Sequence, residues 1–235
     1  METKNIFNFL NELSKNNNIE WMHRHKKEFE VAKNEFSQIT QSLIDKLTLI
    51  DTSLLGLAAK DCIFRIQRDI RFSFDKRPYK EYLSAYIVEG GKKIMKAGYY
   101  FQIQPGKQTL IAGGMHVPPQ EALNLLRKEI LNNGEVLESI LIRNEFKENF
   151  SALIGDSLKM MPKNFPSQHK YEKYIKMKSY DVIYYYEDDF AQNADILIND
   201  MFDKFKLVKP LNDFLNNALM NYVFVPPLKE KNKEK

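Results

Sequence analysis

The chain contains little of the chemistry that cross-links proteins or binds metals. Its 235 residues include one cysteine, one tryptophan and four histidines. The single cysteine, Cys62, cannot form an internal disulfide, which fits the reducing environment of the cytoplasm. One cysteine and four scattered histidines do not supply the usual ligands of a structural zinc site without carboxylates. We therefore expect no disulfide, no metal and no cofactor.

Long apolar runs are absent too. No stretch approaches the roughly 20 apolar residues of a membrane span, and Glu2, Lys4 and Asn5 interrupt the N-terminus, unlike a signal peptide. The sequence thus predicts a cytoplasmic protein without a membrane partner. It also lacks the glycine-rich nucleotide-binding motifs, the G-x-S-x-G hydrolase motif and the H-E-x-x-H zinc motif, so the familiar signatures of those enzyme classes are excluded.

Positive charge is concentrated in one short segment. The chain is 43% hydrophobic and 28% charged, which is typical of a globular protein with its own core. Its formal net charge of +4 is too small for a dedicated duplex-DNA binder. Residues 65–80 hold six cations and two carboxylates, so this segment alone accounts for that net charge of +4. The cations are Arg65, Arg68, Arg71, Lys76, Arg77 and Lys80, and the carboxylates are Asp69 and Asp75.

Helical periodicity dominates both ends of the chain. Apolar residues three to four positions apart predict a first helix that begins after Thr3 as its N-cap, and a long amphipathic helix from Glu20 to Leu49. Further helices are predicted from Pro118 to the Asn132-Asn133-Gly134 stop, from Glu135, through 196–205 after a cap at Asp188 or Asp189, and through 211–219 beyond Pro210.

The middle of the chain has the period of β-strands. Apolar and polar residues alternate over 64–74, and strands are also predicted at 82–88, 99–103, 108–112 and 177–186. Gln104-Pro105-Gly106-Lys107 has the residues of a type II turn and predicts a hairpin, and Gly113-Gly114 is expected to end its second strand.

This order of elements predicts the fold class. Helices, then a central antiparallel sheet within about residues 60–190, then helices again indicate one α+β domain over residues 1–228. Residues 229–235 alternate in charge without an apolar residue and are expected to form a frayed tail.

The basic segment is the strongest candidate for a site. On a strand, one face would carry a row of polar side chains suited to bidentate capture of phosphate or carboxylate, namely Arg65, Gln67, Asp69, Arg71 and Ser73. Asp69 between two arginines would stay ionised. Tyr79 would donate a hydrogen bond or act as a general acid. His116, near a helix start, is a further candidate for meeting a ligand, although the sequence favours a capping or solvent-facing role for it.

The central motif resembles the signature of the family known as domain of unknown function 2461. The likeness rests on Phe64-Arg-x-x-Arg-Asp-x-Arg-Phe-Ser-x-Asp-Lys-x-Pro-Tyr-Lys80, on Asn16-Asn17 with Glu20-Trp21 and Lys26-Lys27, on Gly98-Tyr99-Tyr100 with Pro105 and Gly113-Gly114, and on Lys176-x-Lys178-Ser179. The chain departs from that pattern at Met22 and His25. The resemblance implies a family without an assigned reaction, so it identifies the kind of protein and supplies no mechanism.

Three hypotheses for function follow from the residues. The first is a pocket for an anionic small molecule, held by the six cations, with catalysis left open. The second is a nucleic-acid surface made of the same cations. The third is a protein-interaction module in which the charges form structural ion pairs only.

Overall fold

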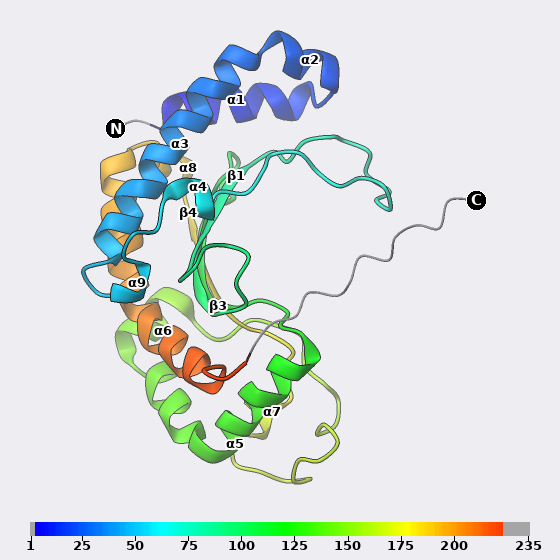
Figure 1. Ribbon diagram of the computed structural model, residues 1–235, viewed down its shortest axis with the longest axis vertical. Coiled ribbons are helices and arrows are strands. Elements are labelled where there is room, and N and C mark those ends of the chain that lie inside the picture. Colours follow the sequence, from blue (N-terminus) through cyan, green and yellow to red (C-terminus); the bar gives the residue numbers. More distant parts are fainter. Residues whose placement is uncertain (1–2, 223–235) are drawn as a thin grey trace.

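The protein is C-shaped, with a sheet at its centre and helices around its convex side (Figure 1). The computed structural model describes residues 3–222, so the predicted tail at 229–235 lies outside the described residues. Four antiparallel strands in the order β1-β2-β3-β4 form the sheet. They are β1 (Leu83–Ile87), β2 (Gly98–Ile103), β3 (Thr109–Met115) and β4 (Tyr180–Tyr186). The predicted α+β class with its central antiparallel sheet is therefore confirmed.

The N-terminal helices differ from the prediction at one point. They are α1 (Lys4–Lys15), α2 (Ile19–Arg24) and α3 (Lys26–Leu47). The helix predicted over 20–49 is broken at His25, whose ring stacks on Trp21 at 4.1 Å and places Nδ1 2.9 Å from the Trp21 carbonyl oxygen. Thr3 occupies the N-cap position, but its hydroxyl donates to the Ala191 carbonyl (2.7 Å) instead of capping α1.

The remaining helices also depart from their predicted ends. They are η1 (Thr52–Leu54), α4 (Ala59–Cys62), α5 (Gln120–Leu141), α6 (Asn144–Phe150), α7 (Glu172–Ile175), α8 (Asp188–Ala191) and α9 (Ala194–Ala218). The stop predicted at 132–134 is a kink at Asn133, after which α5 resumes. α9 continues through Pro210, because the burial of its neighbours Val208 and Leu211 outweighs one lost backbone hydrogen bond.

The predicted hairpin is present, and its turn is held from outside. Gly106 has φ +81, as the third position of a type II turn requires. The amides of Gly106 and Lys107 both donate to the Asp188 carboxylate at 2.8 Å. Asp188 therefore fastens the hairpin to α8. The prediction that it caps the following helix is wrong.

The strand predicted over 64–74 is wrong. In this region only single bridges form, between Ile63 and Ala85 and between Gln67 and Tyr79. Residues 64–80 instead make an irregular arm that extends from β1 over the concave side of the molecule (Figure 1). Alternation of apolar and polar residues indicates a strand only where another strand pairs with the backbone and a second layer buries the apolar face. Phe72 and Phe74 have neither a paired strand nor a covering layer, and both are exposed.

The predicted end of the second hairpin strand at Gly113-Gly114 is also wrong, since β3 runs on to Met115. The two glycines serve close packing instead. A Cβ at Gly113 would lie 2.1 Å from Val208 Cγ1 of α9, and one at Gly114 would lie 1.9 Å from the Tyr180 carbonyl oxygen. Gly114 also has φ +98, a conformation that side chains disfavour.

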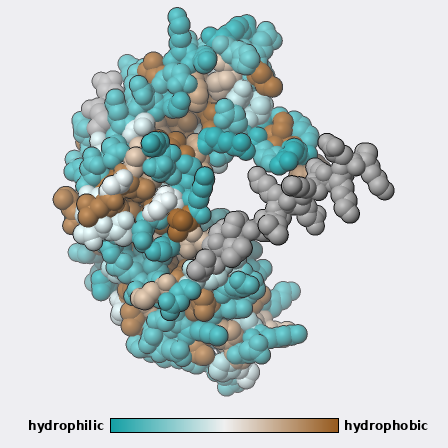
Figure 2. All heavy atoms as spheres, viewed as in Figure 1, coloured by the Kyte–Doolittle hydropathy of each residue, from teal (hydrophilic) through white to brown (hydrophobic). Residues whose placement is uncertain are grey.

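Helices α3 and α9 cover one face of the sheet. Phe36 of α3 stacks on Phe101 at 5.0 Å, and Phe205 of α9 meets Tyr99 edge-on at 5.1 Å. Two buried or half-buried amides fasten α9 to the sheet end. Asn212 accepts from Gly114 N (2.9 Å) and donates to Gly98 O (3.0 Å), and Asn216 bonds both backbone groups of Ala97. The opposite face of the sheet borders the hollow of the C, which persists when all atoms are drawn (Figure 2). Across residues 3–222, no helix is long and apolar enough to span a membrane.

Substituting Gly113 by Ala tests the packing of α9 on β3. We expect a loss of about 1–3 kcal/mol in the free energy of unfolding, because the new methyl group overlaps Val208. Val208→Ala removes the overlapping atom, so the double variant should lose less than the two single losses combined. Denaturant unfolding of the four proteins measures this, and strictly additive losses would contradict the close contact.

Candidate functional site

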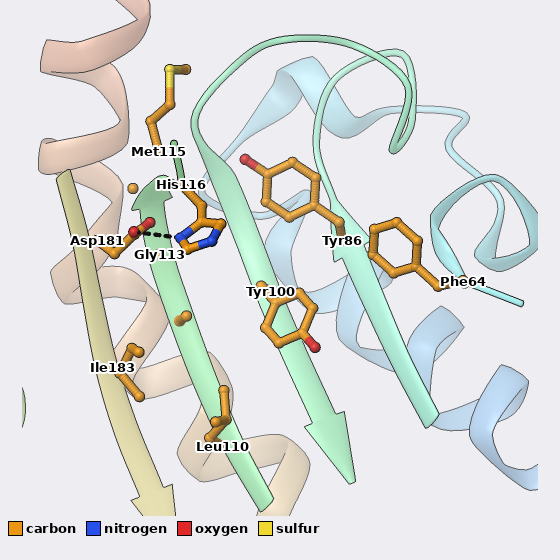
Figure 3. Close-up of a pocket in the computed structure, with 11 residues that line it drawn as sticks. Phe64, Tyr86, Tyr100, Leu110, Gly113, Met115, His116, Asp181 and Ile183 are labelled. Carbon is orange, nitrogen blue, oxygen red and sulfur yellow. Dashed lines mark hydrogen bonds and ion pairs between the residues drawn. The ribbon is translucent and has the colours of Figure 1, made fainter. Parts of the chain in front are cut away.

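A cavity of about 420 Å³ lies on the uncovered face of the sheet. It crosses the strands from β4 to β1, as the labelled side chains in Figure 3 show. Its lining is mainly apolar and aromatic and consists of Phe64, Tyr86, Tyr100, Leu110, Ala112, Gly113, Gly114, Met115, His116, Asp181 and Ile183. Size and lining are typical of a small-molecule site with few polar groups.

His116 and Asp181 form a hydrogen-bonded pair at one end of this cavity (Figure 3). His116 Nδ1 lies 2.8 Å from Asp181 Oδ2. The His116 side chain is 83% exposed, whereas that of Asp181 is only 12% exposed. A carboxylate on Nδ1 keeps the proton of a neutral imidazole there and leaves Nε2 as an acceptor, the arrangement of a general base with its orienting group.

A strained turn holds His116 in this position. Val117, a β-branched residue, has φ +40, which is a rare conformation for such a side chain. Its amide donates to the buried hydroxyl of Ser179 at 3.0 Å, two residues before Asp181 on the same chain segment. Ser179 thereby fixes the turn after β3 to the start of β4, so the histidine and its carboxylate are positioned together.

Burial alters the acidity of the groups in the cavity. It raises the pKa of the Asp181 carboxyl, and the hydrogen bond from His116 opposes this rise. It also raises the pKa of the Tyr86 hydroxyl, with the nearby Asp181 charge as the second cause. Tyr86 donates to the Lys96 carbonyl at 2.6 Å, and burial raises the pKa of Tyr100 to about 12. Both tyrosines therefore stay neutral at physiological pH.

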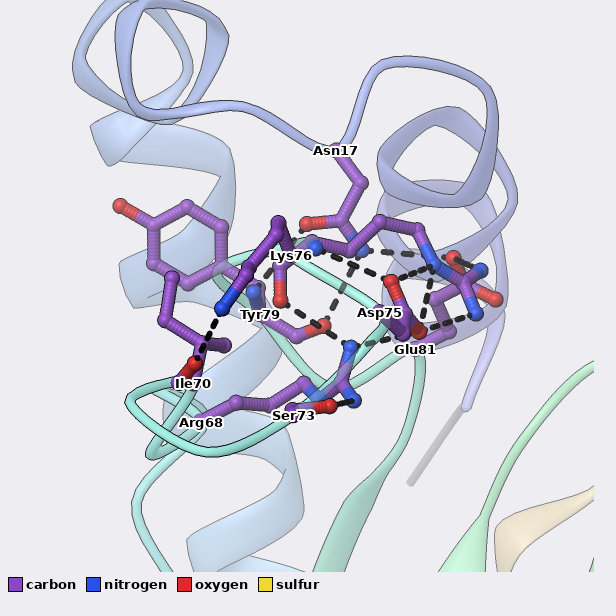
Figure 4. Close-up of polar contacts among 9 residues, drawn as sticks. Asn17, Arg68, Ile70, Ser73, Asp75, Lys76, Tyr79 and Glu81 are labelled. Atoms are coloured by element: carbon purple, nitrogen blue, oxygen red, sulfur yellow. Dashed lines mark hydrogen bonds and ion pairs between the residues drawn. The ribbon is translucent and has the colours of Figure 1, made fainter.

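Arg68 organises the arm from within (Figure 4). Its guanidinium donates to Asp75 Oδ2 (2.7 Å), to the Arg77 carbonyl (3.1 Å) and to the Ser73 hydroxyl (3.5 Å). Asn17, between α1 and α2, fixes the base of the arm by bonding the backbone of Tyr79 in both directions. The Arg68 guanidinium thus links the two sides of the arm, and the Asn17 side chain fastens the arm to the N-terminal helices.

Two other arginines are paired with carboxylates. Arg71 makes a bidentate contact with Asp69, and Arg77 contacts both Asp75 and Glu81. These hydrogen bonds lower the pKa of Asp69 to about 2, so it is ionised as expected. They also hold the pKa of Asp75 far below its usual value, with Arg77 as the main cause.

The other three cations lack such partners. Within residues 3–222 the side chains of Arg65 and Lys80 make no hydrogen bond or ion pair, and Lys76 bonds only the Ile70 carbonyl (3.2 Å). The Lys80 ammonium lies over the rings of Phe64 and Tyr82, at 5.4 and 5.5 Å from their centroids. Burial and the neighbouring Arg65 charge lower the pKa of Lys80.

The predicted site residues therefore separate into groups. None of the six cations lines the cavity; Lys80 lies over the cavity-lining Phe64, and Arg65 follows Phe64 in the chain. His116 lies at the β4 end, while Asp69 and Tyr79 do not line the cavity, and Tyr79 is part of the core. The predicted row of Arg65, Asp69 and Arg71 on a strand face does not exist, because there is no strand.

Sequence reasoning missed Asp181, Tyr86 and Tyr100. A signal for Asp181 was present, since an acidic residue between Tyr180 and Val182 in an apolar strand is costly unless it has a function or a partner. No group of three or more His, Cys, Asp or Glu among residues 3–222 could hold a metal ion.

Comparison with known proteins places the chain in a family. The sequence model of the conserved hypothetical proteins DUF2461 matches residues 5–214. The chain belongs to this family. The match spans the arm, the whole sheet and most of α9, so the resemblance noted in the sequence is confirmed. No curated protein and no solved structure matches the chain. DUF2461 has no assigned reaction, and function must be argued from the site itself.

Asp181→Asn should raise the melting temperature at neutral pH. The raised pKa means that the folded state disfavours the ionised carboxylate, so stability falls as pH rises from below about 4, the ordinary carboxyl value. Asparagine keeps the size of the side chain without the charge. At pH 7 we expect the melting temperature to rise by about 2–4 °C for each kcal/mol of stability that the substitution adds. Below about pH 4 we expect no rise, because the carboxyl is then neutral in the wild type as well.

Asp156→Asn, at an exposed position, is the matched control and should leave the melting temperature unchanged at both pH values. A lower melting temperature for Asp181→Asn at pH 7 would show that the ionised carboxylate stabilises the fold.

Arg68→Ala should open the arm without unfolding the protein. Loss of the three Arg68 contacts releases Ser73 and leaves Asp75 bonded to Arg77 alone, so trypsin should cut after the exposed Arg71 and Lys76 at least several-fold faster. Arg65→Ala removes a cation without a hydrogen-bond partner and is the control. Equal cleavage rates for both variants would contradict the role given to Arg68.

Proposed function

We propose that the cavity binds a small molecule with an apolar or aromatic body and an anionic group, and that His116 acts on it as a general base or acid. The observation that carries this proposal is the 2.8 Å contact between His116 and the buried Asp181 at the end of an apolar cavity. Histidine is the side chain best suited to proton transfer near neutral pH.

The two ends of the cavity have different chemistry. At the β4 end, Asp181 holds one ring nitrogen of His116 and leaves the other free to take a proton from a substrate or from water. Beyond Phe64 at the β1 end, Lys80 lies over the Phe64 ring and Arg65 follows Phe64 in the chain, and both are cations without a carboxylate partner among the described residues. A molecule that spans the cavity would place its anionic group near Lys80 and its reacting atom near His116.

The ion pairs inside the arm reduce the number of cations that are available to bind an anionic ligand. Arg68, Arg71 and Arg77 already hold carboxylates, so they add less to an anion site than the sequence suggests. Arg65 and Lys80 are the contacts we retain. The nucleic-acid hypothesis draws less support for the same reason, since half of the cations it relies on are neutralised locally.

Fluorescence of 8-anilinonaphthalene-1-sulfonate, an aromatic anion, tests the binding proposal. The dye should bind one saturable site on the full chain, and Ile183→Glu should weaken binding at least about tenfold by placing a carboxylate in the cavity that repels the sulfonate. Lys80→Met should also weaken it and reduce its salt dependence. Lys159→Met, outside the cavity, is the control. Binding that these variants leave unchanged would rule out the cavity.

Carbethoxylation of histidines tests the role of His116. Diethyl pyrocarbonate should modify His116 through its free Nε2, and bound dye should protect it. Asp181→Asn should slow this reaction several-fold, because the carboxylate no longer favours the proton on Nδ1. An unchanged rate would show that Asp181 does not activate His116.

A further inference from the structure

The tip of the arm exposes two phenylalanines completely. Phe72 is 95% exposed and Phe74 is 105% exposed. Their side chains therefore make almost no contact with residues 3–222. Two fully exposed aromatic side chains in one short loop are unusual on a monomer, and aromatic side chains are common anchors of protein interfaces, so the arm tip is a candidate interaction surface.

The tip is preorganised. Between the two phenylalanines, Ser73 turns inward, its amide donating to Ile70 O (3.3 Å) and its hydroxyl accepting from Arg68. Lys76 closes the loop through a second bond to the Ile70 carbonyl. The aromatic rings are thus presented by a fixed loop, and ordering this loop does not oppose binding.

The tip does not reach the cavity of its own chain. Asn17 holds Tyr79 at the base of the arm, and the side chains of Ile66 and Tyr79 are buried in the core. Folding the arm back would break these contacts and the Arg68 cluster. The arm nevertheless projects over the concave side, where the uncovered sheet face offers an apolar surface of the kind that a phenyl ring needs (Figure 1).

The geometry points to a second copy of this chain as the partner: the arm tip of one copy covers the cavity of the other, and the reverse. Each chain carries both complementary features, a projecting aromatic tip and an open apolar cavity of about 420 Å³. Reciprocal use of the same two features gives a closed two-fold dimer. The charges also agree, because the net positive arm would approach the buried carboxylate of Asp181.

In such a dimer the partner's arm contributes to the site. Phe72 and Phe74 of the partner would limit the access of water to His116 and its bound molecule. This strengthens electrostatic interactions in the cavity. The inference adds to the proposed function without depending on it, since the association of two chains is measured without any ligand.

Analytical ultracentrifugation of the full chain tests the dimer. The wild type should be mainly dimeric at about 50 µM, a concentration at which a specific interface of micromolar affinity is populated. Phe72→Ser with Phe74→Ser should weaken association at least about tenfold, as expected for anchor aromatics. Leu49→Ser, which changes another exposed apolar residue at 78% exposure, is the control and should remain dimeric.

Mixing variants identifies which surfaces meet. Ile183→Lys changes the cavity and leaves the arm intact, so alone it should be monomeric. Mixed with the double phenylalanine variant, it should form a heterodimer through the single arm and cavity that remain. Circular dichroism and melting temperature establish that both variants are folded. Leu110→Arg gives a second cavity variant if Ile183→Lys is unstable.

Three results would overturn the inference. One is a wild type that stays monomeric at the highest soluble concentration. The second is a dimer that survives loss of both phenylalanines. The third is a dimer that the arm variant disrupts and the cavity variants do not, which would mean that two arms pair with each other. Dye binding that persists in a monomeric arm variant leaves the proposed function intact, so the two proposals can fail separately.

Discussion

The close contact between α9 and the end of the sheet is the constraint on which the site depends. Gly113 lets Val208 approach the strand, and Asn212 bonds the backbones of both Gly114 and Gly98. With one face and one end of the sheet fixed in this way, β3 leaves the sheet at Met115 in a defined direction. His116 follows directly, so helix packing on one face determines where the imidazole lies on the other.

The carboxylate in the cavity and the carboxylates in the arm have opposite environments. In the cavity, Asp181 is nearly enclosed and has a raised pKa, which costs stability and is typical of groups kept for function. In the arm, Asp69 and Asp75 are exposed and have lowered pKa values because arginines bond them. The arm charges therefore shape a loop, whereas the buried carboxylate of Asp181 holds the imidazole of His116 at the end of the cavity.

The most basic segment of the chain is thus largely a scaffold. Arg68, Arg71 and Arg77 are used to close the arm and present its tip. The structural-pairing hypothesis describes these three residues well. Arg65 and Lys80 have no carboxylate partner among residues 3–222, so the charges of this one motif divide between a paired group that shapes the loop and an unpaired pair next to Phe64.

The sequence by itself determined the elements whose signals are local. Helical periodicity, the Pro105-Gly106 turn and the patterns of β1, β2 and β4 depend on neighbouring residues, and so the α+β class could be predicted. Only the tertiary structure decided the rest. The arm resembled a strand but had no partner, the glycine pair looked like a strand end but served α9, and Asp181 met His116 from 65 residues away. Pairing and burial are long-range properties, which local periodicity does not contain.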